Sequence, residues 1–125
     1  MIFLDTHVVV WLYAGERHLI PDAAAARIEA EDIYLSPIVP LELQFLREIG
    51  RLRAEPCRML DVLRETIGVQ VDSSAFFPVV LQAMELKWTR DPFDRLLVAQ
   101  ALLRQAPLLT RDEKIRKHYT HAVWD

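Results

Sequence analysis

Four acidic residues stand at positions where carboxylates can carry out chemistry. Asp5 directly follows the apolar run Ile2–Leu4, and Asp112 stands two residues beyond a later apolar run. Glu42 and Asp94 each have apolar neighbours at helical spacing, which places the carboxylate on the face that a helix would bury. An ionised carboxylate is costly to bury unless it is paired, protonated or bound to a metal ion. These four residues are therefore the candidates for a functional site.

Each of these acids also has an ordinary explanation. Aspartate is common in turns and at helix N-caps, and Arg47 or Arg95 could neutralise a buried acid. Four converging carboxylates, however, would repel one another strongly unless a cation joined them. Oxygen ligands suit Mg²⁺ or Mn²⁺, whereas the single cysteine and the lack of correctly spaced Cys or His pairs argue against zinc. Acids around one or two divalent ions indicate phosphodiester hydrolysis.

The elements that must position these acids alternate along the chain. Short apolar runs predict strands at Ile2–Leu4, Ile33–Leu35, Val69–Val71, Leu108–Thr110 and Ala122–Trp124. Longer stretches with helical spacing predict helices at Thr6–Ala14, Pro21–Ala30, Ile38–Ile49, Glu55–Thr66, Asp72–Lys87, Asp91–Gln105 and Asp112–His118. In the fifth helix the segment 72–74 offers caps, and Pro78 must either sit in the first turn or delay the start.

The alternation of strands and helices predicts an α/β fold, in which helices cover both faces of a short parallel sheet. Ligands in such folds bind beyond the carboxyl ends of the strands. Asp5 and Asp112 both follow predicted strands, so we expect them at matching heights on that edge of the sheet. The sheet therefore predicts where these two acids meet.

Length and composition limit the classes of protein that the chain can represent. Its 125 residues fit one domain spanning 1–125, and 52% of them are hydrophobic. With 15 basic and 18 acidic residues the net charge is −3, which excludes a generally basic nucleic-acid-binding surface but leaves a local one possible. The longest wholly apolar stretch, Val8–Ala14, is too short to span a membrane. A lone cysteine fits a reducing cytoplasm.

Five segments carry a recognisable pattern. In order, they are MIFLDTHVVVWL, LSPIVPLEL, RDPFDRLLVAQAL, LLTRD and the final AVW, and they cover nearly the whole chain. Together they resemble the PIN-domain ribonucleases of the VapC toxin family. The resemblance implies an αβα sandwich with a short parallel sheet. It also maps the family's acidic quartet, which is catalytic and metal-binding, onto Asp5, Glu42, Asp94 and Asp112, with Asp91 as an additional acid near the metal.

The same resemblance implies an activity and partners. It implies a Mg²⁺- or Mn²⁺-dependent endoribonuclease that hydrolyses RNA phosphodiesters by a two-metal-type mechanism. It further implies a homodimer and a small VapB-like antitoxin whose tail occludes the site. Pro40-Leu41 departs from the family pattern, in which an aromatic residue often precedes the acid. The departure concerns substrate contacts more than metal binding.

Residues beside the quartet are candidates for binding RNA. Thr6 and Thr110 match hydroxyl positions that lie beside the acids in the family. Arg90, Arg95 and Arg111 flank the quartet and could bind substrate phosphates. Alternatively, each arginine could neutralise a neighbouring acid.

Aromatic residues near the acids could stack on an RNA base. Trp88 lies in the loop before the RDPFD segment and is the favoured candidate. Trp11 shares a helix face with Val8, so we expect it to pack in the core or in an interface. His7 is expected to pack or to hydrogen-bond locally rather than act as a general base.

An apolar segment spans two adjacent predicted helices. Most of it should be core, but apolar surface left over there would suit an antitoxin helix lying in a groove. Its residues are Phe45, Leu46, Ile49, Leu52, Met59, Leu60 and Leu63.

Other classes of protein share parts of this pattern. Phosphoaspartyl phosphatases carry a DxD motif after the first strand, whereas this chain has Asp5-Thr6-His7. Receiver domains need a strand-end lysine, and none of the three lysines ends a predicted strand. A PIN domain that binds RNA or a protein without cutting is the more serious alternative, although the intact quartet favours an active enzyme.

Overall fold

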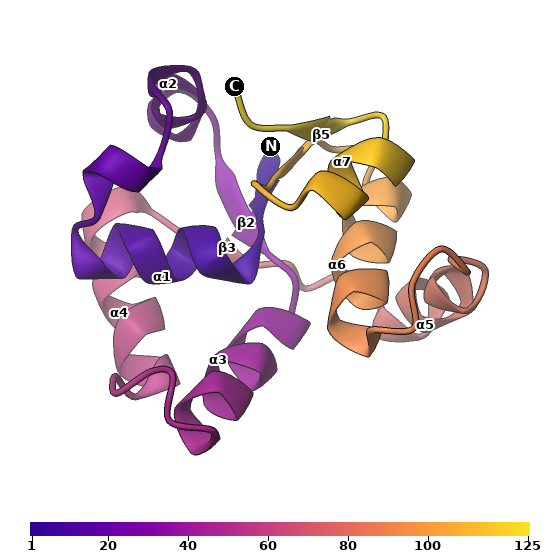
Figure 1. Cartoon of the computed structure of the whole chain (residues 1–125), viewed down its shortest axis with the longest axis horizontal. Coiled ribbons are helices and arrows are strands. Elements are labelled where there is room, and N and C mark those ends of the chain that lie inside the picture. Colours follow the sequence, from indigo (N-terminus) through magenta and orange to yellow (C-terminus); the bar gives the residue numbers. More distant parts are fainter.

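The sheet at the centre of the protein is short and entirely parallel (Figure 1). The computed structural model describes all of residues 1–125. The strands lie in the order β3-β2-β1-β4-β5. They are β1 (Ile2–Leu4), β2 (Ile33–Leu35), β3 (Gln70–Val71), β4 (Leu108–Leu109) and β5 (Ala122–Val123). The predicted α/β fold with a short parallel sheet is confirmed.

Seven α-helices connect the strands and cover the sheet. They are α1 (Thr6–Ala14), α2 (Asp22–Ala30), α3 (Ile38–Glu48), α4 (Pro56–Ile67), α5 (Phe76–Met84), α6 (Pro92–Leu103) and α7 (Glu113–His118). A short 3₁₀ turn, η1 (Arg17–Leu19), has no counterpart among the predicted elements. Helices α1, α3 and α4 lie on one side of the sheet and α5, α6 and α7 on the other (Figure 1). None of these helices combines the length and the apolar sequence that a membrane span requires.

The alternation of side chains along β1 divides the core into two main clusters. Ile2 and Leu4 point into a cluster with residues of α1 to α4, and Phe3 points into a cluster with residues of α6 and α7. Leu4 is completely buried, as is its neighbour in the sheet, Leu109. Because the central strands are covered on both faces, their apolar sequences are nearly continuous.

The start of α5 differs from the predicted one. The segment 72–74 is predicted to cap this helix, but the helix begins at Phe76 without a side-chain cap. Pro78 lies in the first turn, where its missing N–H costs no helical hydrogen bond. The helix ends at Met84, short of the predicted end at Lys87.

Asp72 instead belongs to a buried polar network at the carboxyl ends of β2 and β3. Its carboxylate accepts hydrogen bonds from the Gln100 amide at 2.7 Å and from the Ser74 hydroxyl at 2.9 Å. Burial alone would raise the pKa of Asp72, but these bonds outweigh it and the pKa is lowered. Ser36 donates to the Gln100 side-chain oxygen at 3.3 Å. Because Ser36 precedes α3 and Gln100 lies in α6, the network ties both helices to the sheet edge.

The substitution Gln100→Leu is predicted to destabilise the protein. Leucine has a similar volume but cannot donate to Asp72, so a buried carboxylate loses its shortest hydrogen bond. We expect the free energy of unfolding to fall by about 1–3 kcal/mol, as measured by urea denaturation. Gln44→Leu is the control, because the Gln44 amide bonds only to Glu48 on the same helix. Equal losses in the two variants would contradict the role of the network.

Candidate active site

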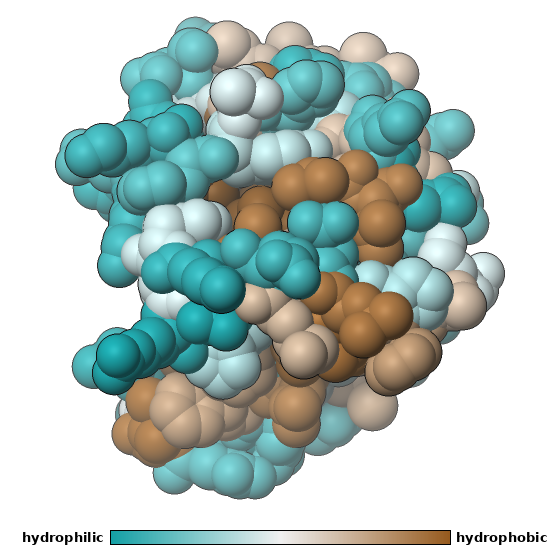
Figure 2. Space-filling model, turned by 90° about the vertical axis from the view of Figure 1, so that its right-hand side faces the viewer, coloured by the Kyte–Doolittle hydropathy of each residue, from teal (hydrophilic) through white to brown (hydrophobic).

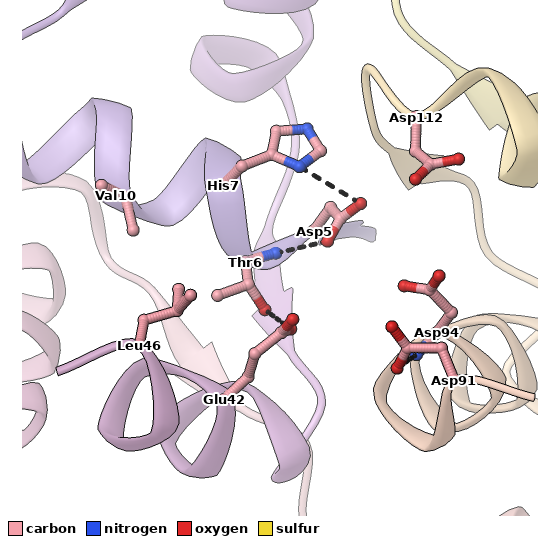
Figure 3. A pocket seen from close by; sticks show the side chains of 9 residues that line it. All are labelled: Asp5, Thr6, His7, Val10, Glu42, Leu46, Asp91, Asp94 and Asp112. Carbon is pink, nitrogen blue, oxygen red and sulfur yellow. Dashed lines mark hydrogen bonds and ion pairs between the residues drawn. The ribbon is translucent and has the colours of Figure 1, made fainter. Parts of the chain in front are cut away.

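A cavity of about 370 Å³ opens at the edge of the sheet where β1 and β4 end (Figure 3). Four of its lining residues are Thr6, His7, Val10 and Leu46. The other five are the acids that the sequence singles out, namely Asp5, Glu42, Asp91, Asp94 and Asp112. The fold therefore brings together residues that lie more than 100 positions apart in the chain.

Three of these aspartates begin helices. The Asp5 carboxylate accepts a hydrogen bond at 2.7 Å from the first backbone N–H of α1. Asp91 accepts two from the first turn of α6, and Asp112 accepts one from the first turn of α7. N-capping, the ordinary explanation for a strand-end aspartate, is thus correct for all three. It also fixes each carboxylate beside the partial positive charge of a helix N-terminus.

Two threonine hydroxyls connect the acids. Thr110 Oγ1 donates to Asp5 Oδ2 at 2.6 Å and accepts from the backbone N–H of Asp112 at 3.0 Å. Thr6 Oγ1 donates to Glu42 Oε1, which links the start of α1 to α3. Thr6 lines the cavity, whereas Thr110 is completely buried and does not. Thr110, predicted to contact the substrate, instead holds the acids in place.

The carboxylates of the cavity have almost no basic partners. Arg47 and Arg95, the two arginines that could have neutralised the buried acids, form no ion pair with any acid. The one basic side chain close to a cavity acid is His7, whose Nδ1 lies 3.5 Å from Asp5 Oδ2. The negative charge of the site is therefore left for something outside the chain to balance.

Burial and repulsion change the titration of two of the acids. Burial raises the pKa of Asp94 to about 7, and the charges of the four other acids in the cavity add to the shift. Burial likewise raises the pKa of Glu42 to about 6. A hydrogen bond from Thr6 opposes that rise, while the charges of Asp5 and Asp91 add to it. The five carboxylates therefore do not all carry full charge at neutral pH without a compensating cation.

The donor set of the cavity fits a hard divalent cation. All five acids offer oxygen, the ligand type that Mg²⁺ and Mn²⁺ prefer, and no arginine or lysine competes for them. Glu42 lies on one wall of the cavity, and Asp91 and Asp94 lie on the opposite wall (Figure 3). As the side chains stand, no three of them form a closed metal cage. The two walls would have to approach an ion that they share.

Comparison with known proteins identifies the family. A family model described as "PIN domain" matches residues 2–120. The chain belongs to the PIN-domain family. Ribonuclease VapC22 of Mycobacterium tuberculosis is 30% identical to this PIN domain over 122 residues, which cover 94% of this chain and 91% of that protein. The predicted relationship to the VapC-type PIN domains is therefore confirmed.

Solved structures share the fold of this PIN domain. One is a crystal structure of VapBC2 from Rickettsia felis bound to a fragment of promoter DNA, with a TM-score of 0.65 and 22% identity over the whole of both chains. Another is VapBC-1 from nontypeable Haemophilus influenzae, with a TM-score of 0.58 and 20% identity. That match covers all of this chain and 97% of the other. At identities of 22% and 20%, the structural similarity establishes the fold alone.

Three residues predicted to bind the substrate do not line the acidic cavity of this PIN domain. Trp88 packs against the second core cluster and stacks on His118, with ring centroids 4.9 Å apart. Arg95 Nε donates to the carbonyl oxygen of Thr89 at 2.7 Å. Arg90 is exposed outside the cavity. The fold therefore does not bring these three side chains to the acids, and their contact with substrate stays a prediction.

His7 and Trp11, which the sequence interpretation sets aside, lie at or beside the acidic cavity. His7 lines it, and its Nε2 accepts a hydrogen bond from the backbone N–H of Arg111 at 3.1 Å. The Trp11 ring packs on the His7 ring, with centroids 4.9 Å apart. The available signal was helical spacing, because Trp11 lies one turn beyond His7 on a helix that begins at the acidic edge.

Asp94→Asn is predicted to stabilise the metal-free protein above neutral pH. A carboxyl whose pKa is raised in the folded state favours folding while it is protonated, and this advantage is lost as pH rises from about 4 to about 7. The amide cannot ionise, so the variant should gain about 1–3 kcal/mol over wild type at pH 8 and little at pH 4. Urea denaturation in EDTA at both pH values measures the difference.

A matched control for this experiment is Glu65→Gln, which removes an exposed carboxylate of α4 that has no ion-pair partner. It should change the stability by less than about 0.5 kcal/mol at either pH. A pH-independent effect of Asp94→Asn would show that repulsion in the cavity does not act as described.

Proposed function

We propose that this PIN domain is a divalent-metal-dependent endoribonuclease and the toxin of a toxin–antitoxin pair. The observation that carries the proposal is the cavity in which five carboxylates meet without an arginine or lysine counterion. The name of its relative, Ribonuclease VapC22, supports RNA as the substrate. Mg²⁺ or Mn²⁺ is the proposed cofactor, because the donors are all hard oxygens.

Asp5, Glu42, Asp94 and Asp112 are the proposed metal-holding and catalytic residues, with Asp91 as a further ligand. When bound, such an ion neutralises charge that develops at the phosphorus and lowers the pKa of water. The chain's own contribution is orientation. Thr110 and a backbone N–H hold both oxygens of Asp5, and Thr6 holds one oxygen of Glu42.

The raised pKa values fit a site that is completed by a cation. Glu42 and Asp94 have the raised values, and they lie on the two opposite walls. A divalent ion between the walls would favour the ionised form of each carboxylate and lower both pKa values. The alternative, a PIN domain that binds RNA or protein without cutting, gives no reason to keep all of these acids together.

Purified protein without its antitoxin is predicted to cut single-stranded RNA in Mg²⁺ or Mn²⁺ and to stop when EDTA is added. Asp5→Asn and Asp94→Asn should each abolish cutting, because each removes an ionised ligand while keeping the side-chain shape. Gel assays with end-labelled RNA measure the products, and circular dichroism checks the fold. The control Glu65→Gln should cut like wild type. Cutting that persists in both aspartate variants would rule out this cavity as the active site.

Apolar surface on α3 is the proposed docking site for the antitoxin. The solved relatives are named as VapBC assemblies, which supports a VapB-like partner for this chain. Of the predicted apolar segment, Met59 and Leu63 are buried, whereas Phe45 and Ile49 are about half exposed, at 46% and 49%. Leu46, on the same helix, lines the acidic cavity. An antitoxin helix lying on α3 would therefore bring its tail to the acids.

A homodimer is proposed through the outer face of α5. Phe77, Leu81 and Met84 follow helical spacing on this face and are 69%, 47% and 60% exposed. Figure 2 shows the side of the molecule that carries α5, where apolar residues gather between polar ones. Exposed apolar residues that lie together on one helix face are typical of an interface.

The substitution Phe77→Glu is predicted to convert a dimer into a monomer, because it places a charge in the centre of an apolar contact. Light scattering coupled to size-exclusion chromatography measures the mass. Ile67→Glu is the control, since Ile67 is also exposed but lies on α4. A wild-type protein that is already monomeric, or a Phe77→Glu variant that stays dimeric, would refute an interface on α5.

A further inference from the structure

A second cleft opens directly beside the acidic cavity. Its volume is about 270 Å³, and its lining residues are His7, Trp11, Arg111 and Asp112. His7 and Asp112 also line the acidic cavity, so the two hollows share a wall. A chain bound at the acids can therefore continue into this cleft.

The floor of the cleft is a fixed aromatic surface. Trp11 packs against His7 and Trp124, with ring centroids 4.9 Å and 5.9 Å away. Trp124 is buried, and His7 is held by its hydrogen bond from the Arg111 backbone. Trp11 itself is half-buried and lines the cleft. Its ring is thus ordered before a ligand arrives, which lowers the entropy cost of stacking.

The wall of the cleft carries a cation that pairs with no acid. The Arg111 side chain is exposed and makes no ion pair or side-chain hydrogen bond. Its guanidinium carbon lies over the Trp11 ring in a cation–π contact, 5.9 Å from the ring centroid. Among the residues that line the two hollows, Arg111 is the only arginine or lysine. An anionic ligand that extends from the acidic cavity into this cleft would therefore meet a permanent positive charge there.

We propose that this cleft binds the nucleotide next to the scissile phosphate, with its base on Trp11 and its phosphate on Arg111. The inference rests on the proposed ribonuclease function. A flat apolar face beside a guanidinium is the combination that recognises an unstacked RNA base. Stacking in this cleft should not depend on which RNA base is present, because every base has a flat face that can lie on the ring. Trp11 thus takes the stacking role that the sequence interpretation gives to Trp88.

Steady-state cleavage of a short single-stranded RNA by the whole protein tests the cleft. Arg111→Gln and Trp11→Leu should each raise KM by roughly 5- to 100-fold, the range expected for the loss of one stacked base. The value of kcat should stay within about threefold of wild type, because neither residue belongs to the acidic set. Arg51→Gln is the matched control, since Arg51 is exposed beyond the far end of α3 and makes no ion pair. It should leave KM unchanged.

An RNA that carries one abasic nucleotide separates stacking from a general structural effect. Beside the cleavage site, the abasic position should raise the wild-type KM by a factor similar to that of Trp11→Leu. In Trp11→Leu the abasic position should raise KM no further, because the ring that it would have met is already absent. In Trp11→Phe, which keeps a smaller aromatic ring, part of the abasic effect should return.

Several outcomes would contradict the proposed role of the cleft. If wild type cuts RNA and both Arg111→Gln and Trp11→Leu keep its KM, the cleft is wrong and the nuclease stands. If those variants lose only inhibition by the antitoxin, the cleft belongs to that partner and the proposal fails. If the wild-type protein does not cut RNA in the presence of any divalent ion, both the proposed function and the proposed role of the cleft are wrong. If the Trp11→Leu variant does not fold, the KM of Arg111→Gln and the abasic effect in Trp11→Phe decide instead.

Discussion

The mutual repulsion of five carboxylates in one cavity is the constraint on which the rest of the structure depends. The fold limits this repulsion with neutral donors and not with basic side chains. Asp5, Asp91 and Asp112 accept backbone N–H groups at helix N-termini, where the partial positive charge favours an anion. Threonine hydroxyls hold Asp5 and Glu42. These hydrogen bonds stabilise the carboxylates but do not neutralise their charge. The charge can therefore still attract a cation.

The short parallel sheet makes this gathering possible. Parallel strands place their carboxyl ends at one edge, so the helices that follow β1 and β4 both begin there and bring an aspartate with them. Glu42 and Asp94 are carried by α3 and α6, whose separation depends on packing and on the buried bonds of Gln100. A network outside the cavity thus helps to hold its two walls in place.

Much of the fold and of the acidic set could be predicted from the sequence, because both depend on local patterns. Apolar runs define the strands, and an aspartate after a strand can lie only at the carboxyl edge. The directions of long side chains could not be predicted, because they depend on tertiary packing. Arg95 lies near the acids in sequence but donates to the carbonyl oxygen of Thr89 and pairs with none of the acids. Asp72 likewise has the sequence of a helix cap, yet bonds to a residue 28 positions away.

The net charge of −3 takes on a different meaning once the cavity is known. Five of the 18 acids lie in it, which leaves 13 acids against 15 basic residues elsewhere in the chain. The acid excess is thus local, and the remaining surface does not repel a polyanion. Even so, the cavity itself contains no arginine or lysine. Under the proposed function, an RNA strand that approaches the cavity would be held by a metal ion at the acids and by groups just outside them. Arg111 and the ordered Trp11 ring are the groups that the fold places there, since α1 begins at the acidic edge and Arg111 follows the end of β4.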